Sequence, residues 1–154
     1  MLLRKIIYIA AGVFLFSSTG AAQNGGKAKI SPLSVKTVSA VKSSSAYAEL
    51  LLRKTERTAE LEELLLDYTE EFPKVKEIRF ELNLIEKDSD KILAVNAAEA
   101  SRLTLALGKL MTRKIELEVN LWNLRIQYKD DHAEVKRARR KIEIFDRAIK
   151  EILP

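Results

Sequence analysis

The sequence predicts an all-α protein in which two tandem helical hairpins pack as an antiparallel four-helix bundle. Three observations lead to this expectation. From Ser44 onward the chain has one glycine and one interior proline, and it is rich in strong helix formers such as Leu, Glu, Lys, Arg and Ala. Its apolar residues recur at three- and four-residue steps, as they do on amphipathic helices. The chain also aligns with itself without a gap when it is shifted so that Leu64 falls on Leu124.

Residues 1–22 have the organisation of a secretory signal peptide. Arg4 and Lys5 precede the apolar run Ile6–Phe16, and the small residues 20–22 form a cleavage site. The run is too short to cross a bilayer, which needs roughly 20 residues. Because no cysteine follows the run, a lipoprotein anchor is excluded. We therefore expect an exported, periplasmic or extracellular protein without a membrane span after cleavage; an uncleaved anchor is the alternative.

We expect residues 23–43 to form a disordered linker, because Gly, Ser and Pro occur throughout them and their apolar residues show no regular spacing. The helical domain then covers residues 44–154. Its first helix is expected from about Ser45, a plausible N-cap, to about Thr69. Pro73 suits the first turn of a second helix, where a missing N–H has no cost. The apolar stripe of this second helix comprises Val75, Ile78, Leu82, Ile85 and Ile92.

The junction between the second and third helices is open to two interpretations. Asn96 and Glu99 have the spacing of a capping box, which would start a new helix. Alternatively, nothing from Lys74 to Leu107 forbids one continuous rod. That alternative is an elongated coiled coil in which the two helices fuse and leave an apolar stripe for a partner chain.

The third helix has two adjacent apolar rows, and so needs more than one neighbour to cover it. The first row comprises Leu103, Leu107, Leu110, Leu117, Leu121, Leu124 and Tyr128. The second row comprises Met111, Ile115, Val119, Trp122 and Ile126. The fourth helix has one narrow stripe, formed by Val135, Ala138, Ile142, Phe145, Ile149 and Ile152.

The internal alignment indicates a duplication, with copies at about 48–93 and 108–153. It places Tyr68 on Tyr128 and Val75 on Val135, and it continues through the break between helices, where a heptad pattern gives no help. Each copy is therefore expected to be a helix, a tight turn and a second helix. The two tyrosines would pack near the turn.

The two turns use different residues at the start of the next helix. In the first copy, Pro73 opens the helix. In the second copy, Asp131 is expected to cap the helix while Glu134, three residues on, completes a capping box.

A short motif around the first turn resembles the periplasmic coiled-coil hairpin of polysaccharide chain-length determinants, which bacterial tyrosine autokinases of exopolysaccharide export share. The motif comprises Leu64–Tyr68, Glu71–Val75, Ile78 and Leu82. Phe72 stands where the family often has His, and His132 occupies the equivalent place in the second copy, without the Pro. The chain lacks the family's flanking transmembrane helices, Pro-rich segment and P-loop kinase. The resemblance implies a freestanding hairpin that contacts an envelope partner or polymer.

The composition argues against catalysis. The chain has one His and no Cys, which excludes the usual zinc ligand sets and a Cys nucleophile. Asp130, Asp131 and His132 are consecutive, so they cannot all face one ion on a regular element. With no phosphate-binding loop either, we expect no enzyme and no cofactor. The net charge of +5 is well mixed and aromatics make up 6 % of residues, which does not favour nucleic acid.

The strongest candidate for partner binding is a basic run on the polar face of the fourth helix. It comprises Lys136, Arg137, Arg139, Arg140 and Lys141. Such a run could meet an anionic envelope polymer, lipid headgroups or an acidic protein surface. The alternative is a solvated face whose charges pair with Glu134, Glu143 and Asp146.

Two functions follow from these features. The first is an exported, non-enzymatic scaffold or interaction module of the cell envelope, with an envelope protein or anionic polymer as partner and self-association left open. The alternative is a small periplasmic chaperone that binds unfolded or envelope proteins. Exposure of Met111, Val119 and Trp122 would favour the chaperone, because an exposed apolar patch marks a binding surface.

Overall fold

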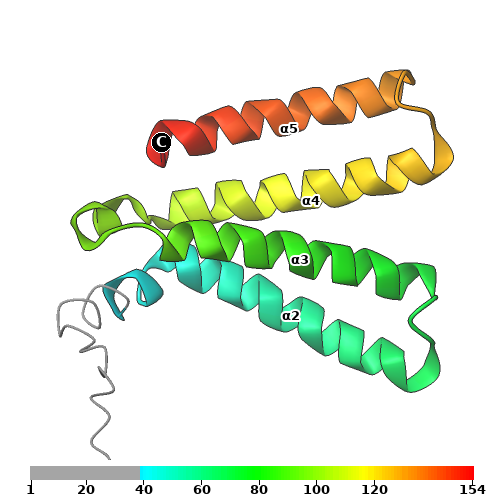
Figure 1. Cartoon of the computed structure of the whole chain (residues 1–154), viewed down its shortest axis with the longest axis horizontal. Coiled ribbons are helices and arrows are strands. Elements are labelled where there is room, and N and C mark those ends of the chain that lie inside the picture. The colour runs from blue at the N-terminus through cyan, green and yellow to red at the C-terminus, as the bar shows by residue number, and fades with distance from the viewer. Residues whose placement is uncertain (1–38) are drawn as a thin grey trace, which may run out of the picture.

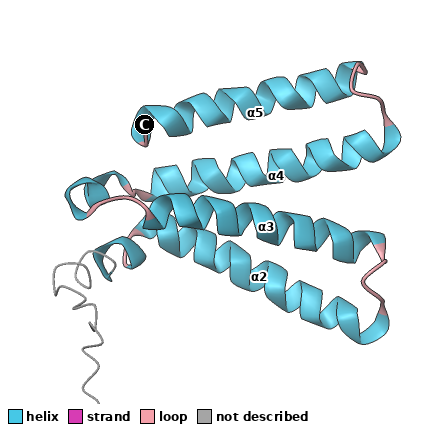
Figure 2. Ribbon diagram, in the orientation of Figure 1, coloured by secondary structure: helices cyan, strands magenta, loops and turns pink. Residues whose placement is uncertain are grey.

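A computed structural model describes residues 39–154, and the expected signal peptide lies outside this range. The described chain is helical and contains no strand, which confirms the all-α class. Figures 1 and 2 show its elements. They are α2 (Ser45–Asp67), α3 (Pro73–Leu93), the 3-10 helix η1 (Ala97–Arg102), α4 (Leu105–Gln127) and α5 (Ala133–Ile152).

The long helices begin where local chemistry favours a start. The hydroxyl of Ser44 accepts a hydrogen bond from the Tyr47 amide at 3.3 Å. The hydroxyl of Thr104 accepts one from the Leu107 amide at the same distance. Ser44, and not the expected Ser45, is therefore the N-cap of α2. Pro73 occupies the first turn of α3, as expected.

The junction between α3 and α4 follows neither interpretation in full. Helix α3 ends at Leu93 and α4 begins at Leu105, so the two do not fuse into a rod. Asn96 precedes η1, but its side chain contacts Glu99 at 3.3 Å and caps no backbone amide. The expected capping box is therefore wrong, and Thr104 provides the cap of α4 instead.

The folded part begins before residue 44, so the last residues of the expected linker are ordered. Residues 39–42 are helical, and Val41 is only 1 % exposed within the main core. The Ser43 hydroxyl also donates a hydrogen bond to the Ala40 carbonyl at 2.9 Å. A single apolar residue without a period gives no sequence signal, although it can still be buried by packing.

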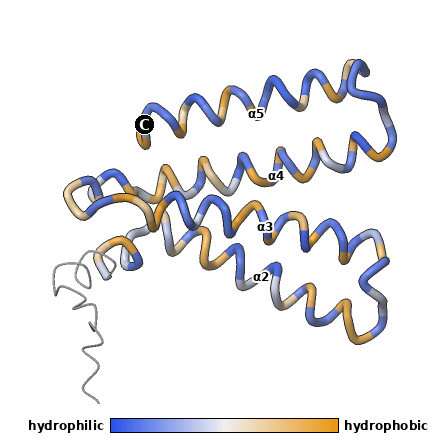
Figure 3. Tube along the Cα trace, in the orientation of Figure 1, coloured by the Kyte–Doolittle hydropathy of each residue, from blue (hydrophilic) through white to orange (hydrophobic). Residues whose placement is uncertain are grey.

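The helices form two antiparallel hairpins, α2 with α3 and α4 with α5 (Figure 1). Helix α4 also contacts α2 and α3, whereas α5 packs mainly on α4. Both turns lie at one end of the molecule, opposite η1 and the end of α5. Figure 3 shows apolar and polar positions alternating along each helix. The main core comprises Val41, Ala46, Leu50, Ile85, Ile92, Leu103, Leu107, Met111, Ile115 and Ile149.

Gly108 allows α2 and α4 to approach closely. A Cβ at this position would lie 2.9 Å from Glu49 Cβ and 3.0 Å from Ala46 Cα. Because one of these atoms is backbone, a larger residue would force the helices apart. Gly108 therefore fixes the distance between the hairpins near the connector.

Candidate functional site

The two hairpin turns have the same geometry, at positions that the internal sequence alignment pairs. Tyr68 ends α2 and its amide donates to the Leu64 carbonyl; Tyr128 ends α4 and its amide donates to Leu124. Tyr68 stacks on Phe72 with ring centroids 4.1 Å apart. Tyr128 stacks on His132 at 4.2 Å. Each turn is thus closed by an aromatic pair across its ends.

The cap of α5 differs from the expectation. His132, and not Asp131, is the N-cap, and its Nδ1 accepts a hydrogen bond from the Glu134 amide at 3.3 Å. Glu134 pairs with Arg137 instead of completing a capping box. The Tyr128–His132 stack holds His132 at the start of the helix. Helix α5 therefore begins one residue later than it would if Asp131 were the cap.

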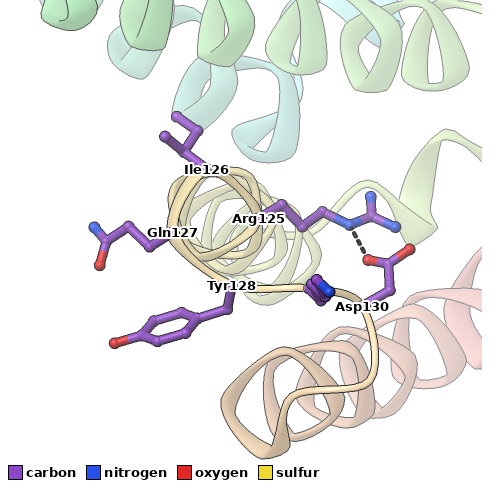
Figure 4. A pocket seen from close by; sticks show the side chains of 6 residues that line it. Arg125, Ile126, Gln127, Tyr128 and Asp130 are labelled. Atoms are coloured by element: carbon purple, nitrogen blue, oxygen red, sulfur yellow. Dashed lines mark hydrogen bonds and ion pairs between the residues drawn. The ribbon is translucent and has the colours of Figure 1, made fainter.

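An arginine–carboxylate pair braces each turn. Arg79 binds Glu70 in the first copy, and Arg139 binds Asp130 at 2.6 Å in the second. Arg125 adds a second contact to Asp130 at 2.9 Å, which Figure 4 shows. The hydrogen bond from Arg79 lowers the pKa of Glu70, and those from Arg125 and Arg139 lower the pKa of Asp130. Both carboxylates therefore stay ionised at neutral pH.

Each turn also exposes an apolar side chain whose exposure the sequence does not predict. Leu66 is 84 % exposed and Ile126, at the equivalent position, is 66 % exposed. Tyr68 and Tyr128 beside them are also exposed. Figure 4 shows Ile126 and Tyr128 projecting from different sides of the end of α4. We call Leu66, Tyr68, Ile126 and Tyr128 the tip residues; the internal alignment could have identified them as pairs.

The basic run on α5 is largely paired within its own hairpin. Arg137 binds Glu134, Arg139 binds Asp130, and Arg140 binds Glu143 at 3.1 Å. Lys136 and Lys141 are exposed and form no ion pair with any residue in the described range 39–154. Of the expected partners, Glu134 and Glu143 bind the run.

Asp146, the third expected partner of the basic run, binds other lysines. It contacts Lys114 of α4 at 3.4 Å and Lys150 at 2.7 Å. Hydrogen bonds from Lys150, and then from Lys114, lower its pKa. Asp146 therefore joins α5 to α4.

The second apolar row of α4 faces the first hairpin as far as Trp122, and Ile126 at its end is exposed. Met111 and Val119 are buried, and Trp122 is half-buried and stacks on Phe80 of α3 with ring centroids 5.6 Å apart. The patch whose exposure would have favoured a chaperone is therefore covered within the chain.

Polar contacts join the two hairpins beside this apolar row. The Arg53 side chain binds the buried Glu81 at 2.7 Å and approaches Glu116 of α4 to 3.8 Å. The Asn123 side chain donates to Glu77 of α3 at 2.6 Å. These contacts fix which residues of the two hairpins face each other.

Neither a metal centre nor a membrane span is apparent in the part of the chain that the structure describes. No group of three or more His, Cys, Asp or Glu residues there could hold a metal ion. Within the same residues, no helix has both the length and the apolar character needed to cross a bilayer. No protein-family model, curated protein or solved structure matches the chain.

Proposed function

We propose that the chain is an exported, non-enzymatic helical scaffold of the cell envelope that binds an envelope protein through its tip residues. The observation that supports this most directly is the exposure of Leu66 and Ile126 at equivalent places on the two turns. An exposed Leu or Ile is common singly. Here each one adjoins an exposed tyrosine, and both turns lie at the same end of the molecule.

The chemistry of the turns favours a protein partner over an anionic polymer. The tips offer aromatic and aliphatic side chains, which are suited to the core of a protein interface. The arginines beside them are already bound to Glu70 and Asp130. The resemblance to envelope hairpins supports the same kind of role. Export rests on the predicted signal peptide of residues 1–22.

The architecture suits a scaffold, and we propose that the hairpins act together as one antiparallel four-helix unit. Helix α4 joins them by contacting all three other long helices. The tips would then be held at fixed separation, so that both could engage one partner. A chaperone is less well supported, because Met111 and Val119 are buried.

Photo-crosslinking in the native cell tests this function. A photoreactive residue at Ile126 should capture one recurrent envelope protein, and the same probe at the exposed Lys87 of α3 should not. Recovery of the chain from the envelope fraction, with a mature N-terminus near residue 23, would support export. Equal capture at both positions, or capture of many unrelated chains at Ile126, would rule out the specific scaffold.

A further inference from the structure

We propose that a second copy of this chain docks its α4–α5 hairpin on the exposed outer face of α2, repeating the contact that joins the two hairpins within one chain. The outer face comprises Ala48, Leu51, Leu52, Glu56, Glu62 and Glu63, all of them exposed. This inference does not depend on the proposed function, because it is argued from the internal repeat and the charges of α2 and α5 and not from the tip residues.

The internal repeat identifies this face. It places both ends of α2 on the corresponding ends of α4, and it places the N-cap Ser44 on the N-cap Thr104. The side of α4 that carries Gly108, Glu116 and Trp122 packs on the first hairpin. On α2 no helix of the described residues packs across the equivalent side; Leu51, at its edge, lies near Ser89 and Leu93 of α3, yet Leu51 stays 49 % and Leu52 57 % exposed.

The Arg53–Glu116 contact between the hairpins corresponds, under the repeat, to another arginine and another glutamate. Within the chain, Arg53 of α2 faces Glu116 of α4 at 3.8 Å. The equivalent residues are Arg113 and Glu56. Arg113 is exposed and pairs only with its own neighbour Glu116, one turn along the helix. Glu56 forms no ion pair within residues 39–154. A docked copy would bring this arginine and this glutamate together.

Two further contacts between the hairpins correspond, under the repeat, to pairs of oppositely charged residues. The Glu77–Asn123 hydrogen bond, 2.6 Å long, corresponds to Arg137 and Glu63.

The Phe80–Trp122 stack corresponds to Arg140 and Glu62. At each of the two places the α2 residue is acidic and the α5 residue is basic. The glutamates of the outer face thus match basic residues of α5, of which Arg137 and Arg140 pair only with Glu134 and Glu143 of their own helix.

The closest backbone approach would be looser in the docked pair than it is within the chain. Ala46 and Gly108 correspond to Ala106 and Ala48, so small residues meet again. Because Ala48 has a Cβ where Gly108 has none, the docked helices would sit slightly farther apart. Ile144 takes the place of Leu84, which packs on the main core, and it is 50 % exposed in the single chain.

This interface is heterologous, because the surfaces on the two copies differ. Each chain has one acidic face on α2 and one basic face on α5, so a docked pair still has a free face of each kind. Such contacts produce open chains or rings rather than closed dimers. Because exposed ion pairs are weak and screened by salt, association should fall as ionic strength rises.

Charge reversal with rescue tests the proposal. By sedimentation velocity at low salt, the purified full chain should form oligomers that grow with concentration. Glu62→Arg/Glu63→Arg alone, and Arg137→Glu/Arg140→Glu alone, should each sediment as a monomer with unchanged helical circular dichroism. Mixing the two variants restores opposite charges at every contact, so the mixture should associate again. A monomeric wild type, associating single variants, or a mixture that stays monomeric would each overturn the proposal.

Disulfide trapping gives a second test, independent of charge. The chain has no cysteine, so engineered thiols have no competitor. Glu63→Cys/Arg137→Cys should form a ladder of covalent oligomers on mild oxidation. The matched control is Glu63→Cys/Arg147→Cys, in which the second thiol lies on an exposed part of α5 outside the proposed contact. Equal ladders from both variants would show random collision and overturn the proposed register.

Discussion

Phe80 of α3 stacks on Trp122 of α4, with ring centroids 5.6 Å apart, and thereby joins the two hairpins far from their covalent connector. Phe80→Ala should lower the free energy of unfolding by about 2 kcal/mol, since both rings are only half-buried. Denaturant titration followed by circular dichroism measures this change. The control is Arg140→Ala at the equivalent exposed position, which should change the stability of the monomer by less than about 0.5 kcal/mol.

The helix caps give a second prediction. Ser44→Ala and Thr104→Ala each remove the hydroxyl that accepts the first free backbone amide of a long helix. Each should lower the free energy of unfolding by about 1 kcal/mol. Ser45→Ala is the matched control, because Ser45 is exposed and does not cap α2. If all three variants melted at the same temperature, the assigned caps would be wrong.

Replacing Gly108 by Ala should change the free energy of unfolding, and whether the variant is stabilised or destabilised shows how tightly α2 and α4 pack. In an exposed helix, replacing Gly by Ala stabilises by about 1 kcal/mol. At Gly108 the added methyl would meet Ala46 backbone atoms at 3.0 and 3.1 Å. Gly108→Ala should therefore destabilise the chain by about 1–3 kcal/mol, as overpacking does. Thermal unfolding measures it, and a stabilised variant would show that the helices can separate freely.

Acid should weaken the contact at Glu77. Burial raises the pKa of this carboxyl, but hydrogen bonds from Lys74 and Asn123, with the nearby charges of Lys74 and Arg57, lower it below its ordinary 4.5 overall. Because the folded-state pKa is the lower one, the stabilisation is present above pH 4.5 and is lost as the pH falls through the folded value. Glu77→Gln should therefore lose less stability than wild type between pH 7 and pH 3, by denaturant titration.

Glu118 should behave in the opposite way and serves as the control. Burial raises its pKa, despite the nearby Lys114. Its protonation therefore favours the folded state as the pH falls, and Glu118→Gln removes that gain. This variant should lose stability more steeply than wild type on acidification. If both variants followed the wild-type curve, the contacts of neither carboxyl would control acid stability.

Local sequence signals predict much of the fold. Pro73 marks the start of α3, and the stripe from Val75 to Ile92 identifies its buried face. The start of α5 is harder to place, because Asp131 is a good capping residue and the stack that makes His132 the cap depends on the folded turn.

The sequence predicts less well which helices pack together. Amphipathic patterns show that a face is buried, but they do not name the helix that covers it. The pattern predicts that α5 shares one bundle core, and Ile149 of α5 does lie in the main core, but the pattern does not show that the main neighbour of α5 is α4.

The candidate surfaces are predicted only in part. The basic run is visible in the sequence, and its pairs with Glu134 and Glu143 follow from helical spacing. Leu66 and Ile126 are missed as exposed residues, because Ile126 continues a row that is buried earlier in α4. Exposure at that point depends on where the first hairpin lies, which no local pattern encodes.

Helix α4 touches every other long helix, whereas α5 depends mainly on α4. Local openings that release α5 therefore need to break mainly its contact with α4, whereas those that release α4 must break its contacts with α2, α3 and α5. Amide hydrogen exchange should accordingly be fastest along α5 and slowest in the first half of α4, around Leu107 and Met111. Helix α5 can thus separate from α4 while the first hairpin stays folded. The free energy of local unfolding should therefore be highest in α4 and lowest in α5.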